Sequence, residues 1–156
     1  MSAHYEVVIE APIEDVWDTL VDLSRYPDWN PFVVRVEAPS SHARVGDSMT
    51  FTVRWGTGGG ATSVEVTTEM TPPAGRTTGE RRRAKWVYAF RGPLNRFNLV
   101  RGSRVQELEE RSGGATLYKT HESFGGLLAR FVPLAKVQDG FERQAKALKT
   151  RVESGA

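Results

Sequence analysis

The sequence contains no cysteine, which excludes a disulfide scaffold, thiolate zinc and iron–sulfur sites, and a cysteine nucleophile. Its three histidines, His4, His42 and His121, stand at unrelated spacings, so we predict neither a metal site nor a cofactor. No apolar run approaches the roughly 18 residues needed to cross a bilayer, and no basic-then-apolar leader opens the chain. We therefore expect a soluble cytoplasmic protein without stable membrane insertion.

The 156 residues fit one domain spanning 1–156, and 39% of them are hydrophobic. The formal net charge is only +2, but basic residues gather between Arg76 and Arg104. Both an anion-binding edge and a solvated surface fit this run, which includes Arg81, Arg82 and Arg83. We favour the solvated surface and predict no nucleic-acid partner, because the aromatic residues there alternate with the charges instead of standing beside them.

Two segments have helical periodicity. After Pro12, apolar residues recur at i, i+3, i+4, i+7 and i+8, which predicts an amphipathic helix; they are Ile13, Val16, Trp17, Leu20 and Val21. Near the C-terminus, Leu134, Phe141 and Leu148 are seven residues apart, which predicts a long helix. Pro133 either begins this helix or kinks it after a shorter turn from Leu127 to Phe131.

Between these helices the apolar period falls to two, which predicts an antiparallel sheet with one buried face. The predicted inward sets are Met49, Phe51, Val53 and Trp55; Val64, Val66 and Met70; and Trp86, Tyr88 and Phe90. Two further strands, about 101–110 and 115–124, are joined through a turn at 112–114. Strands between two helical regions predict an α+β fold.

The segment Ile9–Phe32 closely resembles the start of the START-like (SRPBCC) superfamily, which includes polyketide cyclase/dehydrase-like and Bet v 1-like proteins. The matching features are Val16-Trp17, Asp22 and the corner Tyr26–Pro31, and residues 106–128 resemble the superfamily's final hairpin. The resemblance implies a helix-grip fold, in which a curved antiparallel sheet of about seven strands wraps around a long C-terminal helix. It also implies a deep, mostly apolar cavity between them. We interpret the Trp29-Asn30-Pro31 corner as structural.

The turn centred on Gly113 and the superfamily's register place Arg104 opposite Glu122, facing the cavity. We predict that the two form an ion pair, because a buried carboxylate needs a partner. The pair could orient a ligand's oxygen atoms or serve the structure alone. Because neighbouring residues of a strand point to opposite faces, we predict that His121, next to Glu122, is exposed.

These considerations predict binding of a hydrophobic small molecule, such as a lipid, an isoprenoid or a polyketide-like compound. The alternative is a polyketide aromatase/cyclase or dehydratase-like enzyme that uses Arg104, Tyr118 and Glu122. The sequence contains no catalytic motif, so we assign no catalytic residue. The predicted ligand-binding residues are Phe51, Val53, Trp55, Trp86, Tyr88, Phe90, Arg104, Gln106, Tyr118, Glu122 and Phe141.

Overall fold

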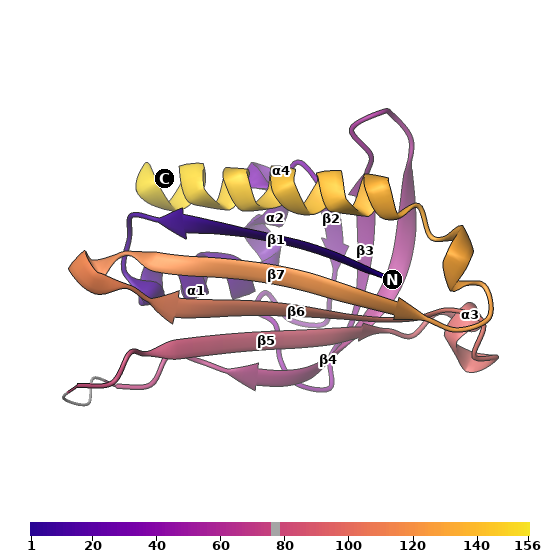
Figure 1. Cartoon of the computed structure of the whole chain (residues 1–156), viewed down its shortest axis with the longest axis horizontal. Helices are drawn as coiled ribbons and strands as arrows, with labels where there is room; N and C mark the ends of the chain where they lie inside the picture. Colours follow the sequence, from indigo (N-terminus) through magenta and orange to yellow (C-terminus); the bar gives the residue numbers. More distant parts are fainter. Residues whose placement is uncertain (76–78) are drawn as a thin grey trace.

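The computed structural model describes residues 1–75 and 79–156, so Arg76 of the basic run lies outside the described residues (Figure 1). The strands are β1 (Ser2–Ile9), β2 (Val33–Glu37), β3 (Ser48–Arg54), β4 (Gly60–Thr71), β5 (Arg83–Phe90), β6 (Arg101–Glu110) and β7 (Thr116–Gly125). The α-helices are α1 (Ile13–Val21), α2 (Tyr26–Trp29), α3 (Pro93–Arg96) and α4 (Leu134–Glu153). Short 3₁₀ turns are η1 (Leu23–Arg25), η2 (Ser112–Gly114) and η3 (Ala129–Phe131).

The strands form one antiparallel sheet in the order β1-β7-β6-β5-β4-β3-β2. Figure 1 shows α4 running alongside β1, with the rest of the sheet curving away beneath it and β3 turning up at one end. This arrangement confirms the predicted helix-grip fold. The sheet and α4 enclose the core between them.

The packing of α4 follows its apolar stripe. Phe141 and Leu148 are buried as predicted, whereas Leu134, at the start of the helix, is half-buried against the same core. Gly140 lets the helix approach Phe32 closely, because a Cβ there would lie 2.4 Å from the Phe32 ring. The N-terminal half of α4 is thereby held against the sheet.

The corner before β2 has the structural role that the sequence predicts. The side-chain oxygen of Asn30 accepts hydrogen bonds from the backbone N–H groups of Phe32 and Val33, each at 2.9 Å. The ring of Trp29 packs edge-on against Tyr26, with 5.1 Å between the ring centroids. The corner therefore fixes how the chain enters β2.

The inward face of β4 differs from the prediction because the strand contains a β-bulge. The pairing with β5 shifts between Thr67 and Glu69, so no residue of β5 stands opposite the extra residue Thr68, although its hydroxyl donates to the carbonyl of Val87 at 3.3 Å. Beyond this point the parity of the strand reverses. The prediction that Val64 and Val66 face the core was wrong: Glu65 and Thr67 are the buried residues, while Met70 does pack against the core.

The basic run also contains an exception. Arg81 and Arg83 are exposed as predicted, but Arg82 is buried. Its guanidinium forms ion pairs with Glu14 of α1 and with Glu110 of β6, the latter at 2.9 Å. The prediction of a solvated surface was therefore wrong for Arg82, which joins α1 to the sheet.

We expect Arg82→Gln to lower the free energy of unfolding by about 1–3 kcal/mol, because it leaves two carboxylates without their shared cation. Half of the Glu14 side chain is exposed, which keeps the loss below that of a fully buried pair. The matched controls Arg81→Gln and Arg83→Gln should change the free energy of unfolding by no more than about 0.5 kcal/mol. Denaturant unfolding of the three variants measures this, and equal losses at all three positions would contradict the assigned bridge.

Candidate functional site

A cavity of about 170 Å³ lies between the sheet and the N-terminal half of α4. Of the residues predicted to bind a ligand, eight line it: Phe51, Val53, Trp55, Tyr88, Phe90, Arg104, Glu122 and Phe141. The lining also includes residues that the sequence did not single out as ligand-binding: Phe32, Val33, Ala61, Ser63, Glu65, Val100, Gly102, Phe124 and Val137. The walls are mostly aromatic and aliphatic, with few polar groups.

A larger hollow of about 400 Å³ lies elsewhere on the sheet. Five charged side chains line it, namely Arg83, Lys85, Glu107, Glu109 and Lys119, whereas three line the cavity under α4. Because a hydrophobic ligand gains little from such walls, the smaller cavity under α4 is the better candidate site.

The other three predicted residues, Trp86, Gln106 and Tyr118, are fully buried in the core but do not line this cavity. The Tyr118 hydroxyl donates a 2.6 Å hydrogen bond to the side-chain oxygen of Gln106. The indole N–H of Trp86 donates to the Thr67 hydroxyl at 3.1 Å. These side chains form the packed layer beneath the cavity.

Arg104 joins β7 to the helix α4. Its Nε donates to Thr120 at 3.0 Å, both terminal nitrogens donate to the side-chain oxygen of Gln144 on α4, and its guanidinium stacks 3.9 Å from the centroid of the Phe141 ring. Sequence reasoning did not single out Gln144, whose buried amide completes this network. The hydrogen-bonded partners of the arginine are neutral.

The predicted ion pair between Arg104 and Glu122 does not form. The register is as predicted, with Arg104 opposite Glu122 on β6 and β7. Within residues 1–75 and 79–156, however, no hydrogen bond or ion pair reaches the Glu122 carboxylate, since the guanidinium is turned toward Thr120 and Gln144. The carboxylate lies instead over Gly102, where an added Cβ would come within 3.0 Å of its oxygen.

Burial raises the pKa of the Glu122 carboxyl to about 7, although the nearby positive charge of Arg104 opposes the shift. Burial also raises the pKa of Glu65 to about 8, and the negative charge of Glu122 adds to this effect. Glu65 faces the cavity because the bulge in β4 reverses which residues of the strand point inward. The alternating pattern of the sequence therefore did not reveal it.

The aromatic walls of the cavity therefore surround two carboxyl groups, each of which gains or loses a proton near neutral pH. A protonated carboxyl can donate a hydrogen bond to a ligand oxygen, and an ionised one can accept a bond from a hydroxyl group. Arg104, which also lines the cavity, places a positive charge behind Glu122. This combination suits an apolar molecule that carries oxygen atoms.

In the described part of the chain, no group of three or more His, Cys, Asp or Glu side chains is arranged to hold a metal ion. No helix within the same residues is long and apolar enough to cross a bilayer.

The sequence profile described as "Polyketide cyclase / dehydrase and lipid transport" matches residues 1–153. The chain belongs to this family. This confirms the resemblance seen in the Val16-Trp17 and Trp29-Asn30-Pro31 motifs. A search of curated proteins finds no match.

Solved structures share the fold at low sequence identity. A hypothetical protein of Helicobacter pylori superposes with a TM-score of 0.71 at 14% identity, over 97% of this chain and 88% of that one. A point mutant of norcoclaurine synthase of Thalictrum flavum, in complex with a transition-state analogue, superposes with a TM-score of 0.66 at 13% identity. The match covers 99% of this chain and 95% of the synthase. The di-domain ARO/CYC protein BexL of the BE-7585A biosynthetic pathway superposes with a TM-score of 0.62 at 16% identity. The match covers 99% of this chain and 49% of BexL. At these identities the likeness shows the fold alone.

The two carboxyl groups predict an unusual pH dependence of stability. Both pKa values in the folded state, about 8 for Glu65 and about 7 for Glu122, lie above the unfolded value of about 4.3. Between roughly pH 5 and 8 the folded state thus holds more protons, so the free energy of unfolding should fall as pH rises through this window.

The double variant Glu65→Gln/Glu122→Gln should flatten this decline, because neither amide can ionise. At about pH 8.5 we expect it to be more stable than the unchanged protein by about 2–4 kcal/mol, and by much less at about pH 5. The two full shifts would give about twice as much, but Glu122 is only half-buried, so water screens part of its charge. Urea unfolding at both pH values measures the change. Glu6→Gln, at an exposed position on β1, is the control and should leave the pH dependence unaltered. A decline that persists in the double variant would refute the shifted pKa values.

Proposed function

We propose that the protein binds a small hydrophobic molecule built on a ring and carrying at least one hydroxyl or carbonyl oxygen. The ring lies among Phe51, Trp55 and Phe141, and the oxygen points toward the carboxyl groups of Glu65 and Glu122. The observation that carries this proposal is the presence of two protonatable carboxyls in an aromatic-walled cavity. Membership of the family supports a role in ligand binding or ring closure.

The size of the cavity favours a ring over a long chain. Its volume of about 170 Å³ is close to that of an engineered cavity of about 150 Å³ that holds benzene. Pockets for larger ligands usually measure about 300–1,000 Å³. Among the three classes that the sequence predicts, a polyketide-like ring compound therefore fits better than a lipid or an isoprenoid chain.

The polar groups favour a ligand with oxygen. A wholly apolar molecule would leave the Glu122 carboxyl without a hydrogen-bond partner, and such unmet groups are costly in a low-dielectric site. A hydroxyl group can donate to ionised Glu122 and accept from protonated Glu65 at the same time. Arg104 would keep its contacts with Gln144 and Thr120 and act only through its charge.

We expect 2-naphthol to bind about tenfold more tightly than naphthalene, since only the former offers a hydroxyl group for a charge-assisted hydrogen bond. Glu122→Ala should abolish this preference while leaving the affinity for naphthalene within about threefold, because the aromatic walls remain. Isothermal titration calorimetry of both compounds measures the two affinities. Glu6→Gln again provides the control. Equal affinities for the two probes in the unchanged protein would rule out the proposed role of the carboxyls.

The pKa values of the two carboxyls also favour a second function, acid–base catalysis of ring closure with loss of water. Near neutral pH, ionised Glu122 can take a proton from the carbon between two carbonyl groups. The enolate attacks a ketone carbon, and protonated Glu65 donates its proton to the alkoxide that forms. Ionised Glu65 then takes the second proton from the same carbon while protonated Glu122 donates to the departing hydroxyl, so water leaves and both carboxyls return to their starting states. Tyr118, which the sequence suggested for this role, is instead hydrogen-bonded to Gln106 in the core and does not line the cavity.

If the protein catalyses this reaction, a short poly-β-ketone mimic should be converted to its cyclic, dehydrated product, with a bell-shaped pH profile centred between about 7 and 8. Glu122→Gln should lower kcat about a hundredfold or more, the scale of a lost general base. Mass spectrometry of the products, 18 mass units lighter per water lost, measures turnover. Absence of turnover alongside tight 2-naphthol binding would leave binding as the function.

A further inference from the structure

Two loops meet at one end of the molecule and expose large apolar side chains. One loop, residues 91–100 and the adjoining first residue of β6, Arg101, contains α3, and the other, residues 126–132, contains η3. The backbone N–H of Leu128 donates to the carbonyl of Leu99 at 2.7 Å, which joins the two. Gly126 allows this approach, since its φ is +103° and a Cβ there would lie 2.6 Å from the same carbonyl oxygen. We call these two joined loops the rim.

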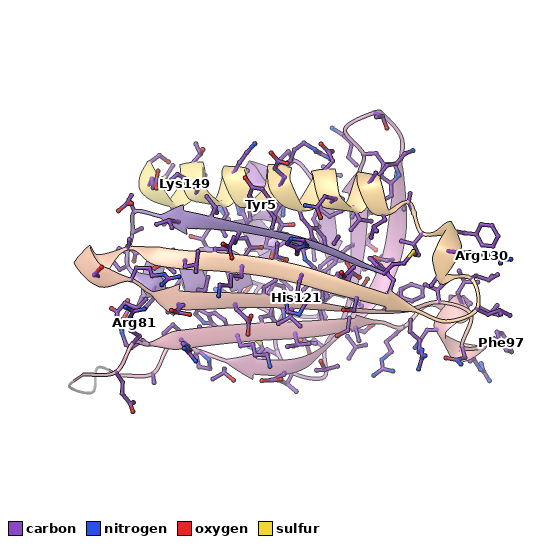
Figure 2. All side chains as sticks on the ribbon, in the orientation of Figure 1. Tyr5, Arg81, Phe97, His121, Arg130 and Lys149 are labelled. Carbon is purple, nitrogen blue, oxygen red and sulfur yellow. The ribbon has the colours of Figure 1, made fainter. Side chains whose placement is uncertain are left out.

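The rim concentrates exposed apolar area. The exposed fractions are 44% for Leu94, 70% for Phe97, 76% for Leu127 and 67% for Phe131. Single exposed apolar residues are common on protein surfaces, but several large ones on two joined loops mark an interaction surface. Figure 2 shows Phe97 and Arg130 projecting at the same end of the molecule, beyond the ends of the long strands.

The charge of the rim has one sign. Arg91, Arg96, Arg101 and Arg130 are exposed there, and the sequences 91–101 and 126–132 contain no acidic residue. Within the residues that the structure describes, no carboxylate pairs with any of these four arginines. Arg130 lies instead over the ring of Phe131, 5.0 Å from its centroid.

The opposite end of the molecule shows the contrast. Arg81, labelled there in Figure 2, lies 3.6 Å from Glu109, and Arg83 lies 4.0 Å from the same side chain. Exposed cations are therefore balanced by acids at one end and left unbalanced at the rim.

We propose that the rim is a docking surface for an anionic lipid bilayer. Phe97, Leu127 and Phe131 would enter the boundary between headgroups and acyl chains, while the arginines bind lipid phosphates. A second copy of this chain is a poorer partner, because it would bring the arginines of both copies together without acids between them. The proposal does not rest on the ligand proposed for the cavity. It does place a bilayer beside Val100, a residue of the rim that also lines the cavity.

Co-sedimentation with vesicles tests this proposal. The protein should bind vesicles of phosphatidylcholine containing phosphatidylglycerol, and bind less as salt rises; vesicles of phosphatidylcholine alone should bind much more weakly. Phe97→Ser/Phe131→Ser should lower the partition coefficient by at least about tenfold, because the apolar area is lost. Arg96→Gln/Arg130→Gln should lower it by roughly fivefold per arginine and weaken its salt dependence.

Two controls match these changes. Arg81→Gln/Arg83→Gln removes the same charge from the opposite end, and Val45→Ser removes an apolar side chain that is 60% exposed elsewhere. Both should bind anionic vesicles within about twofold of the unchanged protein. The proposal is overturned by an absence of binding, by equal binding to neutral vesicles, or by control variants that bind as weakly as the rim variants. It is also overturned if sedimentation velocity shows a dimer that Phe97→Ser/Phe131→Ser dissociates, which would make a second copy the partner.

Discussion

The buried guanidinium of Arg104 couples the sheet to the helix and sets the chemistry of the cavity at the same time. Its nitrogen atoms donate to Thr120 on β7 and Gln144 on α4, and its flat face covers Phe141. Because these contacts hold the guanidinium away from Glu122, that carboxyl remains without a direct partner. A site built from a stronger ion pair would be more rigid, but it would offer the ligand no free acid.

Much of the fold could be predicted because its signals are local. The seven-residue spacing of Phe141 and Leu148 lies within one helix, and it correctly placed their faces toward the sheet. The register of β6 and β7 followed from a single glycine turn, since a tight hairpin leaves few alternatives for pairing. Six of the eight predicted residues that line the cavity lie on strands whose alternation is unbroken at these positions, and Phe141 follows from the spacing within α4.

The remaining features depend on contacts that the sequence does not display. A bulge at Thr68 reversed the parity of β4, so Glu65 was assigned to the wrong face. The bridge from Arg82 to Glu14 spans 68 residues, and only the folded sheet brings the two together. The direction of the Arg104 side chain was likewise missed, because register fixes which residues are opposite each other but not which neighbour a long side chain contacts.

The bulge in β4 divides the strand into two parts: odd-numbered residues face the core before Thr68, and the even-numbered Met70 faces it afterwards. Relative to Met70, the orientation of residues 63–67 therefore depends on the extra residue. A backbone in which that residue joined the ladder would turn Val64 and Val66 inward and Glu65 toward solvent. The acidic character of this wall therefore depends on one extra residue in the strand, and not only on which amino acids the strand contains.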